Sequence, residues 1–218
     1  AGDHGYVIRF ENDPALASAA AQRVVVTHAL DADIDANSFR VGAFGFGALA
    51  FTPPANRAYH SARLGPFDIE VITGTTHTLA VDVLMGLDVT TREAFWIFQT
   101  IDPDTGAPPL DPASGFLPPD WLNRNGEGFV NFSVRANPDA GTGAVIDAVA
   151  AIRFDQNALI WTPAISHTLD AERPTSMLAP LPPATSGASI PLQLSASDGG
   201  LLRADDTQGS GVRNLALY

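Results

Sequence analysis

The sequence predicts an all-β protein folded as an antiparallel sandwich of two sheets. Three observations carry this prediction: apolar and polar residues alternate with a period of two in several segments, turn-forming residues separate these segments, and Asp greatly outnumbers Glu. Nineteen Asp stand against five Glu, and the 218 residues include 19 Gly and 17 Pro. Because Asp, Gly and Pro favour turns whereas Glu favours helices, this composition fits short strands joined by many turns.

The alternation locates the strands in order along the chain. The clearest segment is 77–87, where Leu79, Val81, Val83 and Met85 fall on one face. The predicted strands cover residues 6–11, 23–30, 38–44, 68–72, 77–87, 93–101, 129–135 and 145–154. The Ala-rich residues 14–21 favour one turn of helix. Strands of this length, separated by Pro, Gly and Asp, are typical of a sandwich.

A long connection, residues 102–128, joins two of the predicted strands and is rich in Pro, Gly and Asp. Loops of this length inside a compact domain are usually functional or packed on themselves. Phe116, Leu117, Trp121 and Leu122 lie in it, so we expect it to fold back onto the sandwich.

A change in composition after Asp170 divides the chain. We expect residues 1–170 to form the sandwich domain and residues 171–189 to form a Pro-rich linker or an edge strand. Residues 190–218 then read as a partial second β module, since so short a segment is too small for a complete sandwich. The alternative is that these strands dock onto the first domain.

The charged residues exclude several classes of protein. The formal net charge is -12, with no cysteine, and all twelve basic residues are arginine. Disulfides, thiolate metal sites, cysteine nucleophiles, Schiff-base lysines and Lys–Asn isopeptide bonds are therefore ruled out. A nucleic-acid-binding surface needs an excess of basic residues, and this chain has the opposite.

Several motifs resemble the Ig-like β-sandwich repeat modules of large secreted bacterial surface and adhesin-type proteins. The matching segments are YVIRFENDP (6–14), AQRVVVT (21–27), LDADID (30–35), FRVG (39–42), GLDVT (86–90), FWIF (95–98), IDPDTG (101–106), GEGFV (126–130) and AIRFD (151–155). One departure is His28, which stands where the family usually has Asp. The resemblance implies an Ig-like sandwich at the cell surface, in a protein of many modules with adhesive or scaffolding roles, followed by a fibronectin-III-like or Ig-like module. It carries over no catalytic residue.

The acidic loops suggest a calcium site. Calcium takes six to eight oxygen ligands, commonly from loop carboxylates. Asp102 and Asp104 precede the turn residue Gly106, and Asp111 and Asp120 follow in the same loop. We therefore predict Asp102, Asp104, Asp111 and Asp120 as metal ligands. Residues 31–37 and the acids at 198, 205 and 206 are weaker candidates, and the competing interpretation for all three clusters is that Asp closes turns.

Exposed aromatic side chains suggest carbohydrate binding as an alternative function. Trp121 lies in the long loop beside Asp120 and Asn123, so we predict Trp121 and Asn123 as ligand-binding residues. Trp161 is expected to be half buried and Trp96 to lie in the core. The competing interpretation for each aromatic residue is packing, because such side chains dominate cores as well.

The sequence predicts no catalytic residue. The five histidines lack the spacing of a zinc hydrolase, and there is no Gly-x-Ser-x-Gly motif. The expected function is therefore a non-enzymatic, extracellular structural or adhesive module of a larger bacterial surface protein or filament, with calcium as a stabilising ion. Its expected partners are neighbouring modules, other copies of the chain, or glycans, without nucleic acid or membrane insertion. The alternative is a carbohydrate-binding accessory module of a secreted enzyme.

Overall fold

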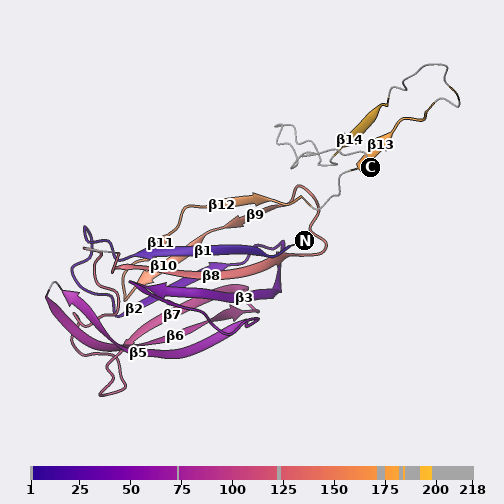
Figure 1. Ribbon diagram of the computed structural model, residues 1–218. Coiled ribbons are helices and arrows are strands. Elements are labelled where there is room, and N and C mark those ends of the chain that lie inside the picture. Colours follow the sequence, from indigo (N-terminus) through magenta and orange to yellow (C-terminus); the bar gives the residue numbers. More distant parts are fainter. Residues whose placement is uncertain are drawn as a thin grey trace. The chain divides into compact units, whose positions relative to one another are not determined.

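The computed structural model describes residues 2–72, 74–121, 124–170, 175–181, 184 and 192–197, and every regular element among them is a β-strand (Figure 1). The all-β prediction is therefore confirmed. The chain divides into two compact units, Ala1–Pro138 with Asp147–Ser166 and Asp139–Ile146 with His167–Tyr218.

The larger unit holds two antiparallel sheets. The four-stranded sheet has the order β1 (His4–Glu11), β8 (Glu127–Ala136), β3 (Ile34–Phe46) and β4 (Leu49–Phe51). The six-stranded sheet has the order β11 (Ile160–Trp161), β10 (Ala150–Phe154), β2 (Arg23–Ala29), β7 (Glu93–Ile101), β6 (Thr75–Asp88) and β5 (Tyr59–Ile72). Their facing sides form one core, as a β-sandwich requires.

Aromatic rings from both sheets meet in this core. Phe132 of β8 lies at the centre, with ring centroids 5.0 Å from Tyr6, 5.3 Å from His28, 5.4 Å from Trp96 and 5.7 Å from Phe39. Each buried side chain of this size contributes about 1.5–3 kcal/mol through the water it excludes. The period-two alternation is therefore what directs one side of each strand into the core.

The long loop does fold back onto the sandwich, as its apolar residues predicted. Phe116 and Leu117 are buried, and the Phe116 ring stacks on Phe98 with centroids 5.8 Å apart. The backbone N–H of Phe116 donates to Oγ1 of the buried Thr100 at 3.0 Å. Gly115 packs so closely that a side chain there would meet the carbonyl oxygens of residues 20 and 21 at 2.4 Å. The loop is thus part of the core.

The structure differs from the expected strands in several places. The strands β4 and β11 lie where no strand was predicted, and β5 extends the predicted strand 68–72 back to Tyr59. Where the Ala-rich residues 14–21 favoured one turn of helix, the structure has a single turn at residues 14–16, closed by Ala17 N–H to Asp13 O. The predicted strand 145–154 is broken at Val149 into β9 (Val145–Ala148) and β10. The physical reason is that the Val149 carbonyl turns to the His28 ring, with its oxygen 2.8 Å from Nδ1.

The remaining strands lie at the division between the units or in the smaller unit. Strand β9 pairs with β12 (Ile165–Thr168), and the division crosses both strands. In the smaller unit, β13 (Thr175–Leu178) pairs antiparallel with β14 (Leu194–Ser197). The expected boundaries at 170 and 189 stay predictions, and residues 198–218 of the expected partial module, with the acids at 198, 205 and 206, lie outside the described residues.

Candidate functional site

The four predicted calcium ligands are placed in turns of the long loop. The Oδ1 atom of Asp102 accepts the N–H of Asp104 at 2.9 Å, and Oδ1 of Asp111 accepts the N–H of Ala113 at 3.0 Å. Oδ1 of Asp120 accepts the N–H of Gly126 at 3.2 Å. Within the described part of the chain, no three acidic or histidine side chains come together as a metal-binding group. Turn closure therefore accounts for three of these acids, and calcium binding stays a prediction.

Asp111 also belongs to a hydrogen-bonded group of three polar side chains. The hydroxyl of the buried Ser114 lies 3.2 Å from Oδ2 of Asp111 and 2.6 Å from Nδ1 of His77. In nucleophilic catalysis the imidazole lies between the hydroxyl and the carboxylate. Here the hydroxyl lies in the middle, where it donates to Asp111 and accepts from His77. The arrangement ties the loop to β6.

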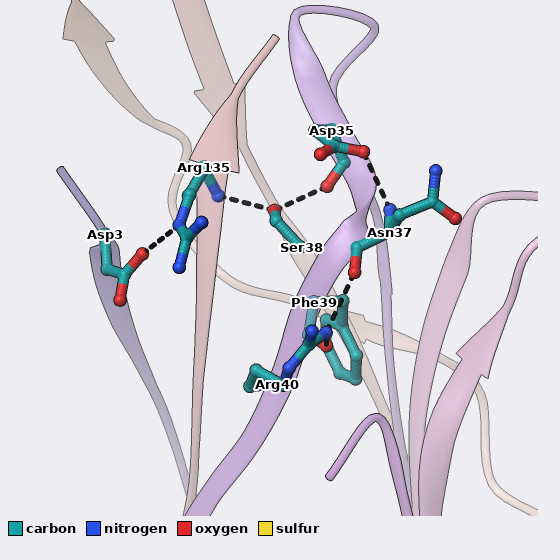
Figure 2. Close-up of polar contacts among 7 residues, drawn as sticks. All are labelled: Asp3, Asp35, Asn37, Ser38, Phe39, Arg40 and Arg135. Carbon is teal, nitrogen blue, oxygen red and sulfur yellow. Dashed lines mark hydrogen bonds and ion pairs between the residues drawn. The ribbon is translucent and has the colours of Figure 1, made fainter. Parts of the chain in front are cut away.

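A second acidic cluster, at residues 31–37, shapes a bulge in β3 (Figure 2). Oδ1 of Asp35 accepts the N–H of Asn37 at 2.9 Å, and the Ser38 hydroxyl donates to the Asp35 carbonyl. The N–H of Arg135 on β8 in turn donates to the Ser38 hydroxyl at 2.7 Å. These bonds replace the ladder contacts that the bulge interrupts.

Two arginines lie at this bulge, Arg40 bonded to it through its side chain and Arg135 through its backbone N–H. Figure 2 shows the Arg40 guanidinium pointing at the backbone, where it donates to the carbonyls of Asn37 at 2.8 Å and Phe39 at 2.7 Å. Arg135 forms an ion pair with Asp3, and this hydrogen-bonded guanidinium lowers the pKa of the Asp3 carboxyl. Phe39 of the same bulge is fully buried in the core, so the contacts described for this cluster are structural.

His28 forms part of the wall of an apolar groove of about 230 Å³ in the larger unit, between β1 and residues 148–150 and 162–165. Burial lowers the pKa of its imidazole, opposed by the hydrogen bond with the Val149 carbonyl. The ring is therefore neutral near pH 7 and packs tilted against Phe132. These features suit a core histidine.

The outer face of the six-stranded sheet presents a different arrangement. Six residues lie opposite one another, one from each strand, and form a continuous row across the sheet. In strand order from β5 to β11 they are Tyr59, Gly86, Phe95, Thr27, Ala151 and Trp161. We call this set the aromatic row, because large aromatic side chains occupy its two ends and its third position.

The aromatic row is open to solvent at both ends. Tyr59 is 56% exposed, Trp161 is 63% exposed, and Phe95 between them is half buried. The expectation that Trp161 would be half buried is therefore wrong, because β11 is an edge strand with two residues and little to cover it. The core position predicted for Trp96 is confirmed, since this side chain is fully buried.

Small residues separate the aromatic side chains of the row. A Cβ on Gly86 would meet Cδ2 of Tyr59 at 3.1 Å and Cζ of Phe95 at 3.3 Å. The two rings thus converge over a position that has no side chain. The next two positions also carry short side chains, and Thr27 is half buried whereas Ala151 is buried.

The predicted ligand-binding residues lie elsewhere. Trp121 is 40% exposed in the long loop, and its backbone N–H donates to the Pro119 carbonyl at 2.8 Å. Asn123 lies outside the described residues. Sequence reasoning considered Trp161 among the residues of the aromatic row and did not place Tyr59, Phe95 or Gly86 beside it. The alternation within each strand shows on which face these residues lie, but the order of strands that aligns them is set by tertiary structure.

Comparisons with known proteins leave the fold as the basis for classification. No protein-family model, curated protein or solved structure matches the chain. Among the described residues, no helix is long and apolar enough to cross a membrane. The protein is thus classed by its architecture as an all-β protein with an antiparallel sandwich.

Proposed function

We propose that this chain is a non-enzymatic structural and adhesive module of a larger bacterial surface protein or filament. The observation that supports this most is the difference between the polar side chains of the loops and the aromatic side chains of one sheet face. Aspartates close turns in the loops, whereas the outer face of the six-stranded sheet carries exposed aromatic residues that stabilise no core. Neighbouring modules and further copies of the chain are its proposed partners.

Protease treatment of intact cells tests this function. Cells that produce the full protein are treated with a protease and probed with antibodies against this chain, beside a cytoplasmic marker. We expect the chain to be labelled and digested on intact cells while the marker is protected. A chain that becomes accessible only after lysis would contradict the proposal.

Calcium is part of the same proposal, as an ion that rigidifies the loop of residues 102–126. Its test is the melting temperature in calcium and in chelator, because an ion that binds the folded state stabilises it. The matched variant is Asp104→Asn, since Asp104 is exposed and donates its backbone N–H, which the substitution keeps. We expect calcium to raise the melting temperature of the parent chain and to do so less in the variant. Equal melting temperatures in calcium and in chelator would refute calcium binding.

The second candidate function is a carbohydrate-binding accessory module of a secreted enzyme. The exposed Trp121 favours it, because an indole face can stack on a sugar ring. Retention of this chain by polysaccharides, lost on Trp121→Ala, would support the predicted loop site. Unchanged retention in this variant would exclude Trp121 as the ligand-binding residue.

A further inference from the structure

We propose that the aromatic row binds an extended neutral glycan, which crosses the strands of the six-stranded sheet and stacks its sugar rings on Tyr59, Phe95 and Trp161. This inference rests on the adhesive role proposed above and names the surface and the class of ligand.

The spacing of the row follows from the sheet itself. Neighbouring strands lie about 4.7–4.9 Å apart, so the backbones at Tyr59 and Phe95 are separated by about 10 Å and those at Phe95 and Trp161 by about 14 Å. One strand-to-strand step is close to the length of one sugar unit in an extended β-linked chain. The backbone positions of the three residues therefore lie at whole steps of about one sugar unit along a single line.

The surface of each ring is suited to this contact. A sugar ring turns C–H groups to one or both of its faces, and these are attracted to the electron-rich face of an aromatic ring. The Tyr59 and Phe95 rings cover the buried Gly86 and so form one continuous platform, and the half-buried Thr27 and buried Ala151 separate this platform from Trp161. A larger residue at Gly86 would press on Tyr59 and Phe95.

Polar groups beside the row can take the sugar hydroxyls. Two residues along their strands from Gly86 and Phe95, on the same face, lie Asp88 and Glu93, which are opposite each other. Both are exposed, and carboxylates accept hydrogen bonds from hydroxyl groups. Backbone N–H groups of Thr90 and Thr91 donate to Asp88 and lower its pKa, so Asp88 stays ionised.

Charge selects a neutral glycan over an acidic one. The chain has a formal net charge of -12, and the carboxylates of Asp88 and Glu93 stand directly beside the row. These carboxylates would repel an acidic polysaccharide, whereas they would not repel a neutral one.

The shape of the surface favours a glycan over a second copy of this chain. The exposed aromatic residues lie along one line, and charged residues such as Arg63, Asp82 and Glu93 share the face with them. A stable protein interface needs about 800 Å² on each partner around a buried apolar centre. A narrow line of exposed rings fits a linear ligand better than it fits the broad surface of a second copy.

The test measures binding of the full chain to soluble neutral β-glucans and xylans, with alginate as the anionic comparison, by affinity electrophoresis and then calorimetry. We expect retention by a neutral polysaccharide and weaker or no retention by alginate. With oligosaccharides of increasing length, affinity should rise until the ligand can reach from Tyr59 to Trp161. Failure of every neutral polysaccharide to bind, or equal binding of alginate, would overturn the proposal.

Four variants locate the site. Trp161→Ala and Tyr59→Ala should each weaken binding by about tenfold or more, the loss of one stacked ring. Gly86→Ala should weaken it by displacing two rings. Leu16→Ala, at an exposed apolar residue off the row, is the matched control and should bind as the parent does. Melting temperatures show whether each variant is folded.

Two other results would overturn the proposal. Loss of binding in Trp121→Ala with binding retained in Trp161→Ala would place the site in the loop. A dimer seen by sedimentation and lost in Trp161→Ala, without glycan retention, would make the row an interface between copies. A chain that is exposed on intact cells and binds no glycan refutes the aromatic row alone, whereas a chain confined inside the cell refutes the surface function.

Discussion

The six-stranded sheet has two faces that use aromatic residues differently, and four consecutive residues of β7 show the difference. Trp96 and Phe98 point into the sandwich and are fully buried, whereas Phe95 and Ile97 point outward and are partly exposed. Trp96 and Phe98 contact rings of the opposite sheet, but Phe95 contributes to a row open to solvent. Because alternation separates the two sets, effects on stability and on binding should separate as well.

The largest expected effect is on the inner face. Trp96→Ala removes a fully buried side chain beside Phe39 and Phe132, so the free energy of unfolding should fall by about 3–5 kcal/mol. Urea denaturation followed by circular dichroism measures it. The neighbouring Phe95→Ala on the outer face should cost clearly less, and equal losses would break the comparison.

Replacing one threonine on each face by valine, which has nearly the same shape, makes the same comparison between the inner and the outer face. Thr100→Val removes the acceptor for the buried N–H of Phe116, and an unpaired buried donor costs about 1–3 kcal/mol. Thr27→Val, on the outer face, should change the free energy of unfolding by less than about 0.5 kcal/mol. Chemical denaturation of both variants measures the difference. If the two were equal, the bond between Thr100 and the loop would have no energetic role.

The pH dependence of stability tests the environment of the inner face. Burial lowers the pKa of His28 below its ordinary value of 6.5, so the unfolded chain takes up the proton first as the pH falls. The stability that the neutral ring contributes is complete above pH 6.5 and is lost as the pH falls from there towards the folded pKa.

His28→Asn provides the control, since its δ-amide lies where Nδ1 lies and can still donate to the Val149 carbonyl. We expect the difference in unfolding free energy between pH 7.5 and 5.5 to be smaller in this variant than in the parent. An unchanged difference would mean that His28 is not the titrating group.

A small effect is also expected for an ion pair on the outer face. Arg63 and Asp82 are bonded at 2.6 and 2.7 Å, and this bond lowers the pKa of the Asp82 carboxyl. The stabilisation is present above the ordinary carboxyl pKa of 3.8 and is lost as the pH falls through the lowered value. Both side chains are well exposed, so Asp82→Asn should cost less than about 1 kcal/mol.

Salt sharpens this last prediction. The loss in Asp82→Asn should shrink further in about 1 M salt, where the screening length falls to about 3 Å. Thermal denaturation at low and high salt measures it, and a cost near that of Thr100→Val would contradict the outer-face assignment.

The strands that alternation identified are those with one buried face. The segments around Val24, Val83 and Trp96 were predictable because one of their sides must leave water. The short strands β4 and β11 carry no such signal, because two or three residues cannot establish a period. The break at Val149 could not be predicted either, since it depends on a contact with His28, 121 residues away in sequence.

The sequence by itself therefore determined the fold class and the face on which each residue of a regular strand lies, because alternation and burial are local properties. It also predicted that the long loop packs down, through Phe116 and Leu117. Only the tertiary structure decided which strands are neighbours and in what register. That order aligns Tyr59, Phe95 and Trp161, which lie far apart in the sequence, and it depends on how the whole core packs rather than on any one strand.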